Sequence, residues 1–265
     1  MDLHLSGRNA VVTGASRGIG LAVASGLAAE GANVVAGARH ITAELAELAT
    51  RHGGRVRPVV ADLSTEEGAQ RLSDEAVSAF GGLDVLVNNV GGLRTRMGGF
   101  LSISDDEWRW GLDVNLLAAV RMTRAALPHL LERTAANIVN VSTVMSFLAD
   151  PDVYDYTAGK AALSNFTKAL SKEVGPQGIR VNTVSPGPVA TGLWTRTDGG
   201  IAPSVVAATG IDQEAFLKEI TSRMVTGRFT EPEEVADVVL FLASDRAGNV
   251  HGADFFIDGG MITTM

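Results

Sequence analysis

The sequence predicts an α/β fold: a single doubly wound domain with a seven-stranded parallel sheet. Two observations carry this prediction. Short β-branched runs alternate with longer segments of helical period along nearly the whole chain, which is typical of βαβ crossovers. The strand segments are apolar on both faces, as expected where helices cover both sides of a sheet. With 265 residues, 46% of them apolar, one domain can bury a large core without disulfides.

Each expected strand is a short apolar run. In order, the seven are Ala10–Thr13, Asn33–Ala38, Val56–Ala61, Val85–Asn88, Ile138–Ser142, Arg180–Ser185 and Ala253–Ile257. Two long helices are expected after the fourth and fifth strands, at Asp105–Leu131 and Tyr156–Val174. Three helix starts carry a hydroxyl with an acid three residues later, the pattern of a capping box: Ser64 with Glu67, Ser104 with Glu107, and Thr230 with Glu233.

One stretch breaks the alternation. From about Thr191 to Asp212 the chain is rich in Gly, Thr, Ala and Pro without a clear period, and a helix is expected from Gln213 to about Met224. A long loop at the carboxyl end of a strand favours a substrate lid, which we place at about residues 191–225. No internal repeat or interdomain linker is evident, so residues 1–265 are expected to form one nucleotide-binding domain.

Composition and charge exclude several classes of protein. There is no cysteine, so no disulfide, thiolate zinc site or cysteine nucleophile can form, and the five histidines are scattered, so no metal site is expected. A net charge of −8 disfavours nucleic acid and acidic lipid as partners. No window approaches a membrane span or a secretory signal. The sequence therefore predicts a cytoplasmic protein that acts on a small molecule.

A glycine-rich turn follows the first strand. The turn contains Gly14, Gly18 and Gly20 and enters a helix that runs to about Glu30. Backbone amides at such a helix N-terminus can cradle a pyrophosphate, because no side chain blocks close approach and the helix dipole favours an anion. A tight turn without a ligand would use the same glycines. This turn, however, lies in the first βα unit, where dinucleotide-binding folds place their phosphates.

The end of the second strand discriminates between NAD and NADP. An acid there would bond the adenosine 2′-hydroxyl, but this sequence has Ala38 followed by Arg39, and the glycine turn contributes Arg17. Two guanidiniums suit a 2′-phosphate through charge-assisted hydrogen bonds, so NADP(H) is expected in preference to NAD(H). The alternative is that both arginines are ordinary solvated surface charges.

The chain has only two tyrosines, Tyr154 and Tyr156, and only the second has a lysine four residues later, Lys160. That spacing puts the phenol and the ammonium on one helix face. A phenol titrates near 10, so action as a base at neutral pH requires a shift worth ~4 kcal/mol, which a nearby cation helps to supply. In the reducing direction the phenol need only donate a proton to a carbonyl oxygen. The pair predicts redox chemistry on a C–O bond, with Tyr154 in the pocket wall or on the surface.

Six motifs, in this order and spacing, resemble the short-chain dehydrogenase/reductase family, and the 3-oxoacyl reductases within it, over nearly the whole chain. They are Thr13-Gly14 with Gly18 and Gly20; Asp62; Asn88-Asn89-Val90-Gly91; Asn115; Tyr156 with Lys160; and Pro186-Gly187. The resemblance implies a Rossmann-type fold and a tetramer or dimer, since relatives mostly form these. It also implies that Val90, which replaces the family's alanine, packs near the cofactor.

The resemblance further implies a mechanism. Tyr156 would be the general acid/base, Lys160 would bond the nicotinamide ribose and lower the tyrosine pKa, and Asn115 would hold a water in the proton relay. The cofactor contacts it implies are Gly14, Ser16, Arg17, Gly18, Ile19, Gly20, Arg39, Asp62, Leu63, Asn89, Gly91, Tyr156, Lys160, Pro186, Gly187, Val189 and Thr191. Of these, Asp62 would contact the adenine, while Val189 and Thr191 would reach the nicotinamide carboxamide.

The family's fourth catalytic group is a serine hydroxyl that bonds the substrate carbonyl. A gap-free count of thirteen residues before the tyrosine falls on Thr143, with Ser142 immediately before it. Alternate residues of a strand point to opposite faces, so the two hydroxyls do not easily exchange roles. We favour Thr143 over Ser142, and expect its extra methyl to narrow the pocket. The alternative is a site that has lost its polarising hydroxyl.

The expected function is that of an NADP(H)-dependent oxidoreductase, a ketoreductase or alcohol dehydrogenase, acting on a small, moderately apolar carbonyl compound or secondary alcohol. Its pocket is expected to be lined by residues 92–97, residues 144–153 and the lid. Two alternatives stay open: a non-catalytic dinucleotide-binding regulator and a 3-oxoacyl-carrier-protein reductase. Carrier-protein reductases present basic residues where the two long helices end, and here only Arg133 is basic, which disfavours a carrier-protein substrate.

Overall fold

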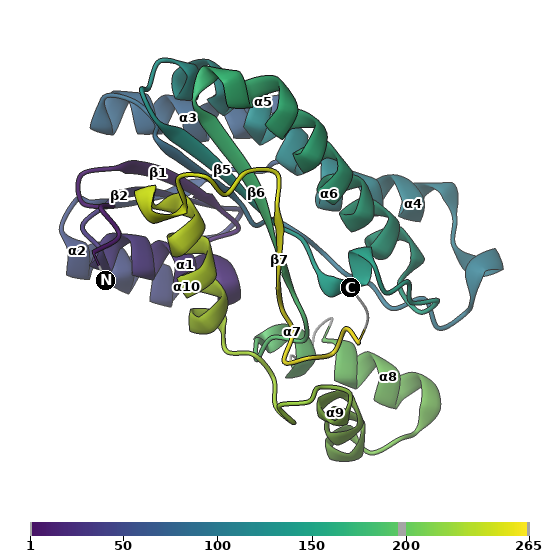
Figure 1. Cartoon of the computed structure of the whole chain (residues 1–265). Helices are drawn as coiled ribbons and strands as arrows, with labels where there is room; N and C mark the ends of the chain where they lie inside the picture. The colour runs from purple at the N-terminus through teal and green to yellow at the C-terminus, as the bar shows by residue number, and fades with distance from the viewer. Residues whose placement is uncertain (1, 196–199, 264–265) are drawn as a thin grey trace.

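Seven parallel strands form one sheet in the order β3-β2-β1-β4-β5-β6-β7, with helices on both faces (Figure 1). This computed structural model describes residues 2–195 and 200–263. The strands are β1 (Asn9–Thr13), β2 (Asn33–Ala38), β3 (Val56–Val60), β4 (Val85–Asn88), β5 (Ala136–Val141), β6 (Ile179–Pro186) and β7 (Asp254–Ile257). The predicted doubly wound parallel fold is confirmed, and no strand end differs from its predicted position by more than two residues.

The helices cover both faces of the sheet and also extend beyond one end of it (Figure 1). They are α1 (Gly18–Ala29), α2 (Ala43–His52), α3 (Glu66–Phe80), α4 (Asp105–Leu112), α5 (Ala118–Leu131), α6 (Tyr154–Val174), α7 (Gly192–Thr195), α8 (Ile201–Thr209), α9 (Gln213–Ser222) and α10 (Pro232–Ala243). Helices α1 and α10 pack together on one face of the sheet, and α3 and α5 pack together on the other (Figure 1). Within the described residues, no helix is both long and apolar enough to cross a membrane.

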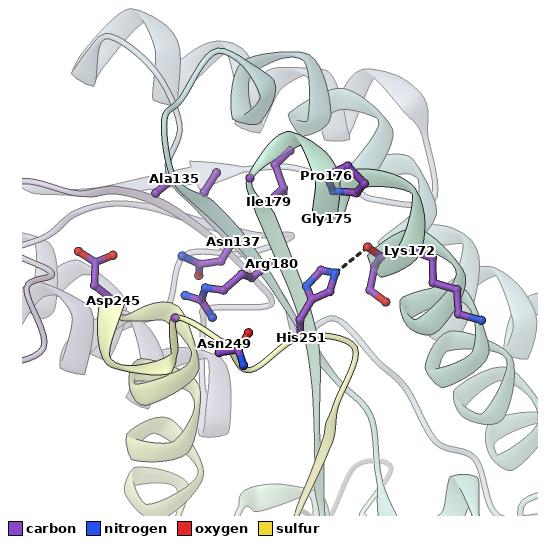
Figure 2. A pocket seen from close by; sticks show the side chains of 14 residues that line it. Ala135, Asn137, Lys172, Gly175, Pro176, Ile179, Arg180, Asp245, Asn249 and His251 are labelled. Carbon is purple, nitrogen blue, oxygen red and sulfur yellow. Dashed lines mark hydrogen bonds between the residues drawn. The ribbon is translucent and has the colours of Figure 1, made fainter.

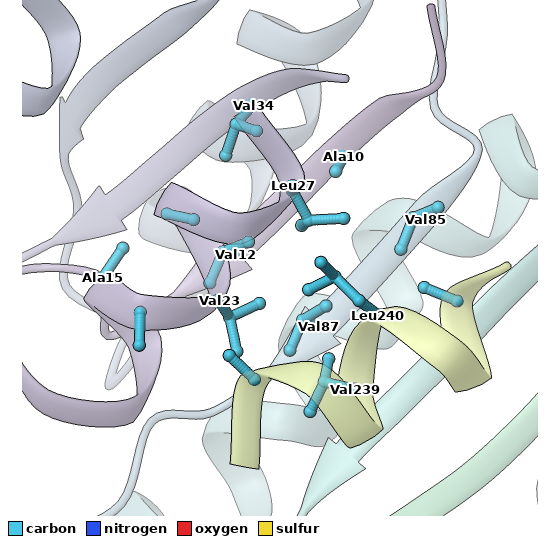
Figure 3. Packing of buried hydrophobic residues seen from close by; sticks show 14 of the residues in the cluster. Ala10, Val12, Ala15, Val23, Leu27, Val34, Val85, Val87, Val239 and Leu240 are labelled. Atoms are coloured by element: carbon cyan, nitrogen blue, oxygen red, sulfur yellow. The ribbon is translucent and has the colours of Figure 1, made fainter. Parts of the chain in front are cut away.

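Each face of the sheet buries its own apolar cluster. On one face, Val12 of β1 packs with Leu27 of α1 and Leu240 of α10 (Figure 3). On the other face, Val11 packs in a cluster with Met122 of α5. Because consecutive strand residues point to opposite faces, both clusters need apolar side chains, which explains why the strands read as continuous apolar runs.

Of the three predicted capping boxes, one is present and two are wrong by one residue. Ser104 and Glu107 form the predicted box at the start of α4. The observed caps elsewhere are Thr65 for α3, and Glu231 with Glu234 for α10. At α10 the predicted cap, Thr230, is buried and its backbone pairs with the segment after β6, so the helix begins one residue later.

The segment expected to be an aperiodic loop contains two helices. Helices α7 and α8 lie within residues 191–212, so that expectation is wrong for the described part, and residues 196–199 lie outside the described residues. The predicted helix from Gln213 is confirmed as α9. Helix α8 has no charged residue, so it shows no alternation of polar and apolar faces from which a helix can be recognised. Figure 1 shows α7, α8 and α9 grouped below the lower end of the sheet.

Candidate active site

The carboxyl ends of β1, β4, β5 and β6 lie at one edge of the sheet. Strand β1 has β2 on one side and β4 on the other, so the strand order reverses there. Open α/β sheets bind ligands outside the carboxyl ends of the strands at such a switch point. The predicted cofactor residues follow the ends of β1 to β6, and the predicted catalytic residues follow β5 or lie on the helices beside it.

The glycine turn after β1 requires its glycines. Gly14 and Gly18 have φ angles of 66° and 54°, a region that side chains disfavour. A Cβ on Gly20 would lie 2.3 Å from the carbonyl oxygen of Gly14, so only glycine fits there. Helix α1 begins at Gly18 with Arg17 as its N-cap, and no side chain caps its first amides. This arrangement fits a pyrophosphate, because the uncapped amides need an acceptor and nothing blocks its approach.

Hydrogen bonds of Thr13 and Asn89 hold the glycine turn in place. The Thr13 hydroxyl donates to the carbonyl of Val87 at 3.3 Å and accepts from the amides of Asn89 and Val90 at 2.9 and 3.2 Å. The Asn89 side-chain amide donates to the carbonyl of Thr13 at 3.0 Å. These bonds tie the ends of β1 and β4 together, so the two motifs act as one unit.

Arg17, Arg39 and Asp62, which are predicted to contact the adenosine half of a dinucleotide, follow the ends of β1, β2 and β3. Arg17 and Arg39 are exposed, and within the described part of the chain neither guanidinium makes a hydrogen bond or ion pair. The backbone amide of Ser64 lowers the pKa of Asp62, and the charge of Arg39 adds to this effect. Leu63, the next residue in the chain after Asp62, is buried. Both arginines are therefore available to an anion.

Thr143, rather than Ser142, faces Tyr156. Burial raises the pKa of the Tyr156 phenol, and a side-chain hydrogen bond with Thr143 opposes that rise. Ser142 points elsewhere: its hydroxyl donates to the backbone carbonyl of Lys160 at 3.2 Å and accepts from Ser164 at 3.2 Å. The alternation of strand side chains thus separates the two hydroxyls as expected, and only Thr143 reaches the phenol.

Lys160 is buried one turn after Tyr156. Its ammonium donates to the carbonyl of Val141 at 2.7 Å, and burial lowers its pKa from 10.5 to about 8. The backbone of Gly91 passes beside it, and a Cβ there would lie 3.2 Å from Nζ and 3.3 Å from Oδ1 of Asn115. Gly91 therefore allows Lys160 and Asn115 to approach each other across the turn that follows β4.

Asn115 lies in a π-helical turn that interrupts the predicted helix over Asp105–Leu131. The turn covers Asp113–Leu117, and its altered pairing leaves the carbonyl of Gly111 to accept from the Asn115 side chain at 2.9 Å. The same side chain bonds both the N–H and the C=O of Gly92, at 3.0 and 2.8 Å. Single π turns occur often at functional sites, and this one presents a buried amide to the loop after β4.

The loop after β6 closes over the glycine turn. The Gly187 amide donates to the carbonyl of Ile257 at 3.0 Å, and Val189 pairs with Thr230 in an isolated parallel bridge. A Cβ placed on Gly18 would lie 3.1 Å from Cγ2 of Thr191. Residues 186–191 are therefore held next to the helix start that the sequence assigns to the phosphates.

A buried ion cluster beside α6 was not predicted. It joins Arg96, in the loop after β4, to Asp155, the residue directly before Tyr156. The two residues are 59 positions apart, so no sequence spacing connects them. Gly111 leaves room for this pair, because a Cβ there would lie 2.4 Å from a carboxylate oxygen of Asp155.

A cavity of about 630 Å³ lies at the opposite edge of the sheet, where β5 and β6 begin (Figure 2). Asn137, Arg180 and His251 line it, and none of the predicted site residues does. The His251 ring bonds the carbonyl of Ser171 at 2.6 Å (Figure 2). No group of three or more His, Cys, Asp or Glu residues within 2–195 and 200–263 is arranged to hold a metal ion.

The fold and the site define an α/β protein of the dinucleotide-binding type. A family model described as enoyl-(acyl carrier protein) reductase matches residues 14–262. The chain is 33% identical over 264 residues to the 3-oxoacyl-(acyl-carrier-protein) reductase FabG of Aquifex aeolicus, covering 98% of this chain and 100% of the relative. It is 37% identical over 266 residues to 3beta-hydroxysteroid dehydrogenase 1 of Eggerthella lenta, covering 97% and 94% of the two chains.

Among solved structures, the L-sorbose reductase of Gluconobacter frateurii, complexed with NADPH and L-sorbose, matches with a TM-score of 0.91. That match has 35% sequence identity and covers 100% of both chains. The chain belongs to the short-chain dehydrogenase/reductase family, and it is an oxidoreductase of that family. The predicted family and enzyme class are thereby confirmed.

Proposed function

We propose that the protein is an NADP(H)-dependent oxidoreductase that transfers hydride between nicotinamide and the carbonyl or secondary alcohol of a small, moderately apolar compound. The observation that carries the proposal is the grouping of Tyr156, Thr143, Lys160 and Asn115 beside a glycine turn that fits a pyrophosphate. An anion-binding turn alone serves many nucleotide-binding proteins. A phenol, a hydroxyl and a buried ammonium beside it are what carbonyl reduction requires.

Tyr156 is the proposed proton donor. Its raised pKa keeps the phenol protonated at neutral pH, as reduction of a carbonyl requires. Lys160, with a pKa of about 8, is mostly charged at pH 7 and stabilises the phenolate that forms as the proton leaves. Bound NADPH supplies the hydride, and Lys160 together with residues of the glycine turn would hold that cofactor.

Thr143 is the proposed partner of the substrate oxygen. Its hydroxyl lies near enough to the Tyr156 phenol to lower the pKa of that phenol, so one carbonyl oxygen can reach both groups. Ser142 is occupied by the Lys160 carbonyl and by Ser164, and we assign it the role of supporting the helix rather than the substrate. Asn115 would hold a water between Lys160 and the solvent, because its Oδ1 faces the turn at Gly91.

The NADP preference rests on Arg17 and Arg39. Both are exposed and without a hydrogen bond or ion pair among the described residues, at the position where a 2′-phosphate would lie. A surface with a net charge of −8 repels anions, so a local pair of guanidiniums supplies the necessary attraction. The structure of the L-sorbose reductase, which carries NADPH, supports the same preference.

The proposed substrate region has exposed apolar side chains and lies beside a segment with few buried residues. Exposed large apolar side chains follow the ends of β4 and β5: Met97, Phe100, Leu101, Phe147 and Leu148. We retain the lid over residues 191–225 as a proposal, supported by how little of its described part is buried: Gly200, Ala202, Ile220 and Met224. Arg133, just after the end of α5, is paired with Asp84 at 2.9 Å, which disfavours an acidic carrier protein as partner.

The test supplies NADPH with a panel of small ketones, diketones and 3-oxoacyl thioesters. Oxidation of NADPH is measured by absorbance. Saturable oxidation of NADPH with at least one free ketone is expected. Binding of NADPH, seen by fluorescence, without turnover of any member of the panel would favour the non-catalytic regulator instead. Turnover of acyl-carrier-protein thioesters alone would favour a 3-oxoacyl-carrier-protein reductase.

A further inference from the structure

Arg96 and Asp155 form a buried, bidentate ion pair. Arg96 Nε donates to Oδ1 of Asp155 at 3.0 Å and Nη2 donates to Oδ2 at 2.6 Å, while Nη1 donates to Glu107. The side chains of Arg96 and Asp155 are 5% and 1% exposed. A guanidinium that meets a carboxylate at both oxygens fixes the orientation of the two groups as well as their distance.

Three segments meet at this pair. The Arg96 amide donates to the carbonyl of Asp152, just before α6, at 2.6 Å. Glu107, on α4, closes the capping box with Ser104 and also accepts from Arg96. Gly111 leaves the space that the Asp155 carboxylate fills. The loop after β4, helix α4 and the start of α6 are therefore joined through one guanidinium.

The ion pair of Arg96 with Asp155 lies next to the proposed proton donor, Tyr156. Asp155 directly precedes Tyr156 in the first turn of α6, and the N-cap of that helix, Val153, makes no side-chain capping bond. A helix start without a cap frays unless something else holds it. Buried ion pairs add little net stability compared with apolar residues, so their value lies in fixing geometry.

Two other arginines nearby, Arg94 and Arg109, are exposed to solvent. Arg94, two residues earlier, is exposed and lies over the ring of Trp110, with Cζ 3.8 Å from the ring centroid. Arg109, on α4, pairs with Asp105 and Asp106, but its side chain is 71% exposed. Only Arg96 of these three is buried and bonded to the residue that precedes Tyr156.

We propose that Arg96 is a positioning residue for the reaction. Through Asp155 it holds the first turn of α6, so that the Tyr156 phenol stays beside Thr143, and it ties the loop after β4 to the same turn. The inference rests on the proposed function, in which Tyr156 is the proton donor. Displacement of a reacting group by about 1 Å lowers rates on the order of 100-fold, so release of this turn is expected to slow the chemical step.

The test compares Arg96→Ala, Arg96→Lys and the matched control Arg109→Ala in ketone reduction with NADPH. Arg96→Ala is expected to lose roughly 50-fold in kcat. Arg96→Lys keeps the charge but cannot meet both carboxylate oxygens, and is expected to lose roughly tenfold. The Kd for NADPH, measured by fluorescence, is expected to stay within about twofold in both, because the glycine turn is untouched. Arg109→Ala is expected to match the wild type.

Rescue of kcat by added guanidinium ion distinguishes a loss of positioning from a general loss of structure. At concentrations well below those that unfold the protein, it is expected to refill the space in Arg96→Ala and to raise kcat about fivefold, without raising that of Arg109→Ala. If Arg96→Ala does not fold, Arg96→Lys decides the question. A folded Arg96→Lys or Arg96→Ala protein with kcat within twofold of the wild type overturns the inference alone. Absence of any turnover in the wild type overturns the proposed function, and the inference with it.

Discussion

The proposed nucleotide side of the molecule, formed by β1 and the glycine turn after it, differs in its packing from the segment that runs from α7 to α9. All five residues of β1 are buried, and the turn that follows is fixed by bonds between Thr13 and Asn89. In α8 only Ala202 is buried, and Val225, after α9, is 86% exposed. Groups that meet an invariant cofactor need fixed positions, whereas a segment that meets a variable substrate can be loosely held.

The largest effect is expected at Tyr156. Tyr156→Phe removes the phenol hydroxyl that faces Thr143 and is expected to lower kcat by about 10³-fold, with little change in the Kd for NADPH. Tyr154→Phe is the matched control, because it keeps the ring that contacts Phe100, and is expected to retain kcat within about threefold. If Tyr156→Phe retains activity within tenfold, Tyr156 is not the proton donor.

Substitution of two glycines tests the contrast in rigidity. In Gly20→Ala the new Cβ would lie 2.3 Å from the Gly14 carbonyl, so we expect a loss of about 3 kcal/mol in unfolding free energy and at least tenfold weaker NADPH binding. Gly210, beyond α8, has a φ of 73° and open space around it. Gly210→Ala is expected to lose only ~1 kcal/mol, with cofactor binding intact. Denaturant titration measures both, and equal losses would remove the contrast.

The buried ammonium of Lys160 is expected to lower the free energy of unfolding at neutral pH. Its folded pKa, about 8, is below the ordinary 10.5, so between these values the unfolded chain binds more protons and stability rises with pH. Lys160→Met removes this dependence. The unfolding free energy of the wild type should therefore rise relative to Lys160→Met by ~3 kcal/mol between pH 7 and pH 10.5. A constant difference across this range would show that the ammonium is not desolvated.

Much of the nucleotide side was predictable from sequence because its determinants are local. A glycine turn, an apolar strand and a tyrosine with a lysine four residues on each lie within a few residues. The π turn at Asn115 and the pair of Arg96 with Asp155 depend on contacts between distant segments, so no local pattern indicates them. Helix α8 was missed because it has no charged residue. Two caps were misplaced by one residue, because Thr65 rather than Ser64 accepts from the first turn of α3 and the backbone of Thr230 pairs with the segment after β6.

The smallest expected effect concerns motion of the proposed lid. Amides of α8 and α9 are expected to exchange with deuterium at least tenfold faster than those of β1, because few of their side chains are buried. Binding of NADPH with a substrate is expected to slow exchange in the segment more than in β1. Hydrogen-exchange mass spectrometry measures both. Protection of α8 equal to that of β1 without ligand would contradict a lid.

The most direct test of the account is the ratio of kcat/KM with NADPH to that with NADH, for one ketone that the wild type reduces. We expect the wild type to prefer NADPH by at least tenfold, because Arg17 and Arg39, which have no hydrogen bond or ion pair among the described residues, can bind the 2′-phosphate. In Arg17→Ala/Arg39→Ala that ratio is expected to fall to near one while activity with NADH is kept. A wild-type preference for NADH of tenfold or more would contradict the account.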